Sequence, residues 1–235
     1  MRTLCFSLIL ALAATTLRAE ETSLELVLLA DASGSIDARE LAFQREGYAQ
    51  AITDPGVLDV IQSTAYGHIA LTYVEWATNQ AQVADWARID DAESAEAFAQ
   101  AIRTGPRQAY GRNAIGAALL EGVRLMEEND FEGFRRVIDF SGDSANNWSG
   151  PGIAEARDQV VAAGVTINAL PILRPDDPGR AQGGLEALYE ERIIGGPGAF
   201  VVTAEDRASF AEAVRRKLIL EISGAPKPPR IADRN

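Results

Sequence analysis

Short apolar runs alternate with amphipathic stretches along most of this chain. The runs have the length typical of buried strands, and turn residues bound them. They lie at residues 24–30, 68–77, 137–140, 165–172 and 199–202, with residues 80–89 as an expected edge strand. Helical patterns fill the intervals, at 38–53, after Asp91, after Asn113, near 153–163, at 185–193 and up to about residue 222. This alternation predicts an α/β protein.

The predicted architecture is a doubly wound, mostly parallel six-stranded sheet with helices on both faces. Thr78-Asn79 is expected to form the turn that makes residues 80–89 antiparallel. Asp54-Pro55-Gly56 is interpreted as a helix stop, and Thr203-x-x-Asp206 as a capping box before the last helix. No internal repeat or interdomain linker interrupts the pattern, so one domain is expected.

The loop after the first predicted strand carries Asp31, Ser33 and Ser35 at alternate positions, with Gly34 between the two serines. Three short oxygen side chains are thereby gathered at a strand end. Hard divalent cations such as Mg²⁺ take oxygen ligands and keep several waters. A metal-binding loop is one interpretation. The other is that Ser35 or Asp37 only caps the helix that begins near Ala38.

Two further loops are expected at the same edge of the sheet, because ligands bind beyond the carboxyl ends of parallel strands. One carries Asn113 at a predicted helix start, and the other carries Asp143 after the strand 137–140. The combined set offers carboxylate, hydroxyl and amide oxygens but no His or Cys. This chemistry favours Mg²⁺, with Mn²⁺ or Ca²⁺ as alternatives, over softer metals.

These three motifs, in this order, resemble the von Willebrand factor A-like domain and its metal-ion-dependent adhesion site. The resemblance covers residues 24–222, and it implies a Rossmann-like fold. Asp31, Ser33 and Ser35 match the D-x-S-x-S motif, Asp143 matches the later aspartate, and Asn113 stands where the family has threonine. The segment around residues 141–147, together with an export signal, also resembles an uncharacterised secreted bacterial branch of that family.

By this resemblance Ser33 and Ser35 would ligate the metal directly, while Asp31 and Asp143 would hold its waters. Asn113 would either ligate through its amide oxygen or cap its helix. An open coordination position would accept an Asp or Glu from a partner protein. The implied function is a metal-dependent adhesion or scaffold module, with no enzymatic activity. Trp148, close to Asp143 in the chain, is expected at the rim of the site.

Two other interpretations stay open. A scaffold of the same fold that has lost its metal is possible because Asn113 departs from the family pattern. A serine hydrolase is suggested by Gly142-Asp143-Ser144 after a strand, but such an enzyme needs a general base. The chain has one histidine, His68, at the start of a different predicted strand. Asn146 and Asn147 are expected to shape the loop by bonding to its backbone.

The two ends of the chain differ from the rest. Residues 1–19 resemble a signal peptide, with Arg2, an apolar stretch and a cleavage site near Ala19, which predicts a periplasmic or secreted protein. Cys5 lies within that signal, so the exported chain would have no thiol. The domain is then expected at 20–223, and a Pro-rich tail at 224–235.

Charge narrows the choice of partners. The formal net charge of the chain is −12, and removal of Arg2 and Arg18 with the signal makes it −14. Nucleic-acid binding usually needs a basic surface, so this acidity argues against it. No second apolar segment is long enough to span a membrane, which takes about 20 residues. A protein partner is the remaining expectation.

Overall fold

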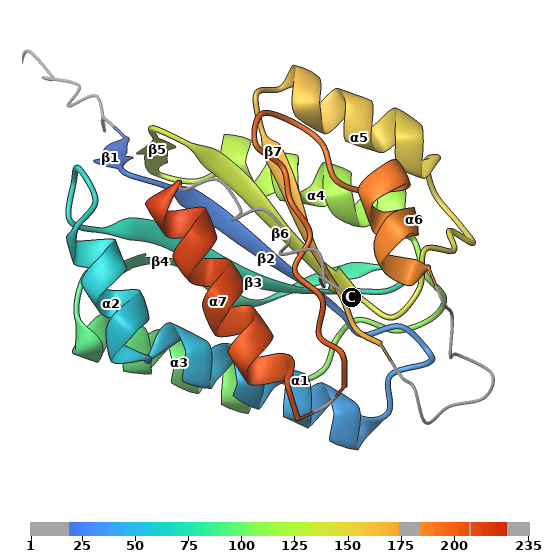
Figure 1. The fold of residues 1–235 in the computed structure, drawn as a ribbon, viewed down its shortest axis with the longest axis horizontal. Coiled ribbons are helices and arrows are strands. Elements are labelled where there is room, and N and C mark those ends of the chain that lie inside the picture. The colour runs from blue at the N-terminus through green and yellow to red at the C-terminus, as the bar shows by residue number, and fades with distance from the viewer. Residues whose placement is uncertain (1–18, 174–183, 207, 225–235) are drawn as a thin grey trace, which may run out of the picture.

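The computed structural model describes residues 19–173, 184–206 and 208–224. Its centre is a five-stranded sheet in the order β4-β3-β2-β6-β7 (Figure 1). Neighbouring strands are parallel except for β4, which is antiparallel to β3 at one edge. The strands are β2 (Glu25–Asp31), β3 (Ile69–Trp76), β4 (Gln80–Ile89), β6 (Arg136–Gly142) and β7 (Thr166–Pro171). The predicted fold class and the antiparallel edge strand are confirmed.

Helices cover both faces of the sheet (Figure 1). One face packs against α1 (Ala38–Ile52), α2 (Pro55–Gln62), α3 (Ala92–Thr104) and α7 (Phe210–Ser223). The other packs against α4 (Ile115–Glu127), α5 (Ile153–Ala162) and α6 (Leu185–Arg192). Strand β2 serves both cores, because Leu26 and Leu28 lie in the first and Val27 and Leu29 in the second. Successive side chains of a strand point to opposite faces, so a fully apolar strand suits a sheet that is covered on both sides.

The sheet has five strands where the pattern predicted six. Residues 199–202, predicted as the last strand, lie beside β7 but are joined to it only by one isolated parallel bridge, Ala169–Val201. The Asn168 side chain accepts a hydrogen bond from the Phe200 amide at 3.1 Å, a bond that in a regular ladder would go to a backbone carbonyl. A short parallel pair, β1 (Glu20–Thr22) with β5 (Phe131–Gly133), was not predicted.

One local prediction is incomplete and another is wrong. Asp54-Pro55-Gly56 does not only end a helix; it also begins α2, because Asp54 accepts hydrogen bonds from two backbone amides and Pro55 occupies the first helical position. Before α7 the reciprocal bonds join Asp206 and Ser209, not Thr203 and Asp206. Helix α7 therefore begins at Phe210, later than the proposed capping box implied.

A charged cluster lies within the core between β6 and α7. The Lys217 ammonium is 2.8 Å from Asp139 Oδ1 and 2.5 Å from Glu221 Oε1, and all three side chains are fully buried. Asn168 donates to Glu221 Oε1 at 3.0 Å. Burial raises the pKa of the Glu221 carboxyl to about 8; Lys217 opposes the rise and Asp139 adds to it. The cluster is thus electrically balanced when Lys217 neutralises Asp139 and Glu221 keeps its proton.

Candidate metal site

The candidate site lies at the carboxyl ends of the two central strands. Asp31 is the last residue of β2, and Asp143 directly follows β6, the strand beside it. The Asp143 amide donates to Asp31 Oδ2 at 3.4 Å, so the two loops meet there. Because β2 and β6 are parallel, both loops leave the sheet at the same edge, as the strand pattern predicted.

Four of the five predicted site residues are brought together by their side chains. Asp31 Oδ1 accepts a hydrogen bond from the Ser33 amide at 2.8 Å, which holds the loop in a tight turn. The Ser33 and Ser35 hydroxyl oxygens are 3.0 Å apart. Ser35 Oγ donates to Asp143 Oδ1 at 3.4 Å. Asp31, Ser33, Ser35 and Asp143 therefore form one continuous set of oxygen atoms.

Asp31 is the more deeply buried of the two carboxylates in this set. Its side chain is fully buried, and it forms no ion pair with any residue that the structure describes. Burial, together with the nearby Asp143 charge, raises the pKa of the Asp31 carboxyl to about 7, although the hydrogen bond from Ser33 opposes the rise. A buried carboxylate that has no partner cation is costly unless a cation from outside compensates it.

The oxygen set fits a small hard cation. Neighbouring ligands of an octahedral Mg²⁺ with bonds of 2.0–2.1 Å lie about 3 Å apart, and the two serine hydroxyl oxygens are 3.0 Å apart. The described residues contain no group of three or more His, Cys, Asp and Glu side chains placed to hold a metal. Binding here would therefore depend on the serine hydroxyls and on retained waters, which suits Mg²⁺ better than a softer metal.

Asn113 does not cap its helix. The N-cap of α4 is Ala114, and no cap bond comes from a side chain at that position. The first turn is instead satisfied from another loop, since Asn147 Oδ1 accepts a hydrogen bond from the Gly116 amide at 3.4 Å. Asn147 also donates to the Pro151 carbonyl at 2.8 Å, which confirms that this side chain bonds to backbone.

Asn113 lies between the other two loops of the site. Its carbonyl accepts a hydrogen bond from the Trp148 amide at 2.8 Å, and the neighbouring Gly111 carbonyl accepts one from the Gly34 amide at 2.7 Å. Its side chain is 8% exposed and forms no hydrogen bond with the described part of the chain. Trp148 is 63% exposed beside this junction, at the rim, and Arg112 stacks on its ring.

Arg107 is a supporting residue that the sequence pattern did not reveal. Its guanidinium donates to the carbonyls of Ala32 at 2.6 Å and Ile36 at 3.1 Å, and so holds both ends of the Ser33–Ser35 loop. Gly111 is also required, because its φ is +105° and a Cβ there would lie 2.4 Å from the Thr78 hydroxyl. Both features depend on contacts between segments that are distant in the sequence, and no local motif predicts such contacts.

Two aromatic side chains form hydrogen bonds to the end of β6 and to the loop that follows it. Tyr189 of α6 donates to the Ser144 carbonyl at 3.1 Å, and Trp76 donates to the Ser141 carbonyl at 3.1 Å. Gly142 has little space, since a Cβ would lie 3.0 Å from both aromatic side chains and 3.1 Å from Asp31 Oδ2. Packed aromatic residues thus position Asp143 against Asp31.

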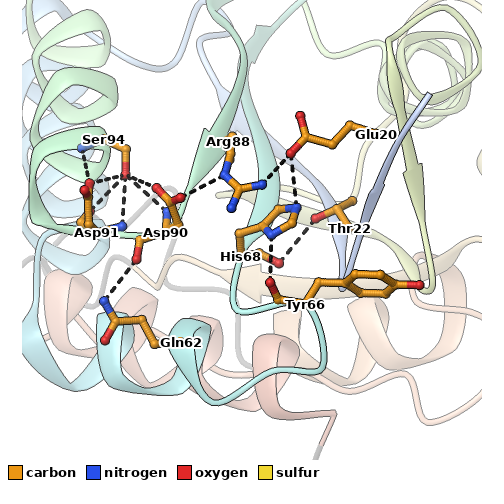
Figure 2. A network of polar contacts seen from close by, with 9 residues as sticks. All are labelled: Glu20, Thr22, Gln62, Tyr66, His68, Arg88, Asp90, Asp91 and Ser94. Atoms are coloured by element: carbon orange, nitrogen blue, oxygen red, sulfur yellow. Dashed lines mark hydrogen bonds and ion pairs between the residues drawn. The ribbon is translucent and has the colours of Figure 1, made fainter. Parts of the chain in front are cut away.

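His68 lies at the opposite end of the sheet from Ser144. It precedes the first residue of β3, whereas Ser144 follows the last residue of β6, and both strands run parallel to β2. Figure 2 shows His68 in a separate polar network, with its Nε2 3.4 Å from Glu20 and its Nδ1 2.9 Å from the Tyr66 carbonyl. The Ser144–His68 pair that a hydrolase would need is therefore not formed.

The fold is that of a von Willebrand factor A domain. A von Willebrand factor type A protein from Catenulispora acidiphila has a TM-score of 0.57 at 17% identity, over 86% of this chain and 43% of that one. The vWF domain of the type V pili tip protein Mfa5 from Porphyromonas gingivalis gives 0.56 at 11% identity, over 90% and 99%. Proximal thread matrix protein 1 from the mussel byssus, with a zinc-occupied MIDAS motif, gives 0.56 at 16% identity, over 86% and 46%.

Within that fold, the chain belongs to the family described as "Protein of unknown function (DUF1194)", whose model matches residues 21–226. No match was found among curated proteins. The chain spans less than half the length of the Catenulispora and mussel proteins. No helix in the described ranges is long and apolar enough to cross a membrane.

Proposed function

We propose that this protein is a metal-dependent binding module, in which a divalent cation held by Asp31, Ser33, Ser35 and Asp143 bridges to a carboxylate of a partner protein. The carrying observation is the fully buried Asp31, which lies at the meeting point of two strand ends without a described cation partner. Mg²⁺ is the proposed metal, with Mn²⁺ or Ca²⁺ as alternatives, because every available side-chain ligand is oxygen.

Asn113 is proposed as a further ligand, through its amide oxygen. The residue borders both neighbouring loops, and its side chain is not used to cap α4. When bound, the metal would supply an open coordination position for an Asp or Glu of the partner. The role of this chain's own residues is to hold that cation at the surface and to present Trp148 and Arg112 beside it.

Adhesion or scaffolding is the role that we propose for such a bridge. Two structures of similar fold are a pilus tip protein and a matrix protein with a zinc-occupied MIDAS motif. We further propose export, with residues 1–19 as a cleaved signal, 20–223 as the binding domain and 224–235 as a tail. N-terminal sequencing of the protein from its native host should begin close to Glu20, and an intact Met1 on the exported protein would refute this part.

Calorimetric titration tests the metal site directly. The wild-type protein should bind Mg²⁺ or Mn²⁺ at one site, and Asp31→Ala should abolish that binding. Asp85→Ala is the matched control, because Asp85 is an exposed aspartate on β4, at the edge of the sheet. Equal binding by wild type and Asp31→Ala would place the metal elsewhere, and loss of binding in Asp85→Ala would point to a nonspecific charge effect.

A further inference from the structure

Two aromatic rings and one arginine border the candidate metal loop, and we call Tyr110, Arg112 and Trp148 the rim surface. Tyr110 and Arg112 lie on either side of Gly111, whose carbonyl accepts a hydrogen bond from the Gly34 amide at 2.7 Å. The Arg112 guanidinium stacks 5.2 Å from the centre of the Trp148 ring. Gly34 lies between the two candidate serine ligands, so the rim surface adjoins the loop that would hold the metal.

The rim surface has the composition of a binding site for protein. Among the described residues, five large hydrophobic side chains are exposed, and two of them, Tyr110 and Trp148, belong to this surface. The other three, Phe43, Tyr66 and Phe134, lie in other segments of the chain. Single exposed apolar residues are common, but Trp, Tyr and Arg together are the residue types that contribute most to the energy of protein interfaces.

Contacts within the protein hold this surface in place. The Tyr110 hydroxyl donates to the Arg107 carbonyl at 2.8 Å, and the Arg107 guanidinium lies 5.1 Å from the centre of the Tyr110 ring. The Thr78 hydroxyl donates to the Arg112 carbonyl at 3.1 Å and accepts from the Arg112 amide at 2.9 Å. A surface that is ordered before binding loses less conformational entropy when a partner binds.

The charge of the rim surface indicates the chemistry of its partner. Arg112 is exposed, and it forms no ion pair with any residue in the described ranges. A guanidinium can donate two parallel hydrogen bonds to one carboxylate. A basic partner segment would instead place its positive charge against both Arg112 and the proposed metal. The rim surface therefore fits an acidic segment.

We propose that the rim surface binds an acidic segment of a partner protein, and that this segment carries two carboxylate side chains. One carboxylate enters the open position of the metal, so the inference rests on the proposed function. The other pairs with Arg112, while the segment packs against Trp148 and Tyr110. The second contact gives specificity, because a partner that offers only one carboxylate leaves Arg112 unpaired.

The test selects binders from a random dodecapeptide library on the immobilised full chain in Mg²⁺. Selected peptides should carry at least two Asp or Glu residues, and fluorescence polarisation then measures their affinities. Arg112→Gln should weaken binding about tenfold, the loss of one charged hydrogen bond, and Trp148→Ala should also weaken it. Changing one peptide carboxylate to its amide should weaken binding to wild type about tenfold and have no further effect on Arg112→Gln, because the two groups form one contact.

Arg216→Gln is the matched control. Arg216 is also an exposed arginine without a described ion pair, but it lies on α7, which contributes nothing to the candidate site. Peptide binding to this variant should stay within about twofold of wild type.

A chelator separates this inference from the proposed function. If the chelator weakens peptide binding but Arg112→Gln and the peptide amide have independent effects, the pairing with Arg112 is wrong and the metal bridge stands. If these effects stay coupled and the chelator changes nothing, the pairing stands and the metal bridge is wrong. Selection of peptides without acidic side chains, or of none, would overturn the assignment of an acidic partner.

Discussion

Two buried carboxylates of this protein are compensated in different ways. Asp139, on β6, is fully buried and has Lys217 at 2.8 Å. Asp31, at the end of the neighbouring strand β2, is equally buried but pairs with no described cation. The chain therefore supplies an internal counterion for the carboxylate in the middle of the sheet but none, among the described residues, for the one at its edge. This difference separates a structural acid from a candidate ligand.

The position along the strand explains why the solutions differ. Asp139 points toward α7, where a lysine stem can pass through the apolar core and place its ammonium beside the acid. Asp31 ends its strand at the edge of the sheet, and the loop that follows it carries the partly exposed Ser35. The middle of β6 faces a helix that supplies a lysine, whereas the end of β2 meets loops that offer backbone amides to its carboxylate. The following predictions test the comparison.

The largest effect is expected from Lys217→Met, which leaves Asp139 without its counterion. Removing one member of a buried ion pair typically costs about 3–5 kcal/mol of unfolding free energy. Urea denaturation should show a loss of that size. The double variant Lys217→Met/Asp139→Asn should be less destabilised than the two single losses predict, because no unpaired charge then remains. Additive losses within about 0.5 kcal/mol would show that the pair is not coupled.

In contrast to Lys217→Met, the Asp31→Asn substitution should not lower the free energy of unfolding. Without metal the variant should be at least as stable as wild type, since a buried charge disappears while an acceptor for the Ser33 amide remains. With Mg²⁺ at 100 times its Kd, wild type should gain about 2.7 kcal/mol and the variant nothing. Thermal unfolding with Mg²⁺ and with chelator measures both, and Asp85→Asn should gain as wild type does. A gain in Asp31→Asn equal to that of wild type would contradict the comparison.

Glu221 predicts a pH dependence within the compensated cluster. Its folded pKa is raised from 4.5 to about 8, so the folded state keeps a proton that the unfolded state loses above pH 4.5. Stability from this group is therefore full below pH 4.5 and falls as pH rises toward 8, by at most about 1.4 kcal/mol per unit. Glu221→Gln should remove this decline. In urea denaturation, the unfolding free energy of the variant minus that of wild type should therefore increase between pH 6.5 and 7.5.

The control for that experiment is Glu212→Gln, an exposed change on the same helix. Asp31 contributes to the pH dependence of the wild type in the same direction, so the comparison uses differences between variants and not the wild-type slope alone. Parallel pH profiles for Glu221→Gln and wild type would mean that the Glu221 carboxyl does not hold its proton when folded.

The parts of the fold that were predictable from sequence are those set by local patterns. Continuous apolar runs identified β2 and β3, and the Asp91 cap identified α3, whose amide of Ser94 donates to Asp91 at 2.8 Å. Helix α2 was missed because Asp-Pro-Gly serves both to stop one helix and to start another. The short β1–β5 pair was missed because its register is set by distant segments.

The candidate site also has a part that local sequence patterns predict and a part that they do not. The spacing of Asp31, Ser33 and Ser35 is local, and parallel strands bring Asp143 to them. What holds the loops is not local: Arg107 reaches back to Ala32, and Asn147 reaches from its own loop to α4. The buried pairing of Lys217 was also unpredictable, because a Lys–Glu pair four residues apart on a helix more often lies on the surface.

The smallest expected effect concerns Asn113, the residue at which this chain departs from the adhesion-site pattern. Asn113 does not cap α4, and at 8% exposure its side chain forms no hydrogen bond with a described residue, a cost that metal ligation would offset. Its amide oxygen lies one atom further from the backbone than a threonine hydroxyl would, and its NH₂ cannot ligate. Mg²⁺ tolerates such a misfit poorly, whereas Ca²⁺ accepts longer bonds and looser geometry.

Asn113→Thr should therefore tighten Mg²⁺ binding severalfold, and Asn113→Ala should weaken whatever binding exists, with the fold unchanged in both. Calorimetric titration of the three proteins with Mg²⁺, Mn²⁺ and Ca²⁺ decides the point, and a wild-type preference for Ca²⁺ that Asn113→Thr reverses would support direct ligation most strongly. Asn147→Ala serves as the control, because it removes the actual support of the α4 first turn and should lower stability without changing which metal is preferred. Equal affinities across the Asn113 series would show that Asp31, Ser33, Ser35 and Asp143 hold the metal without it.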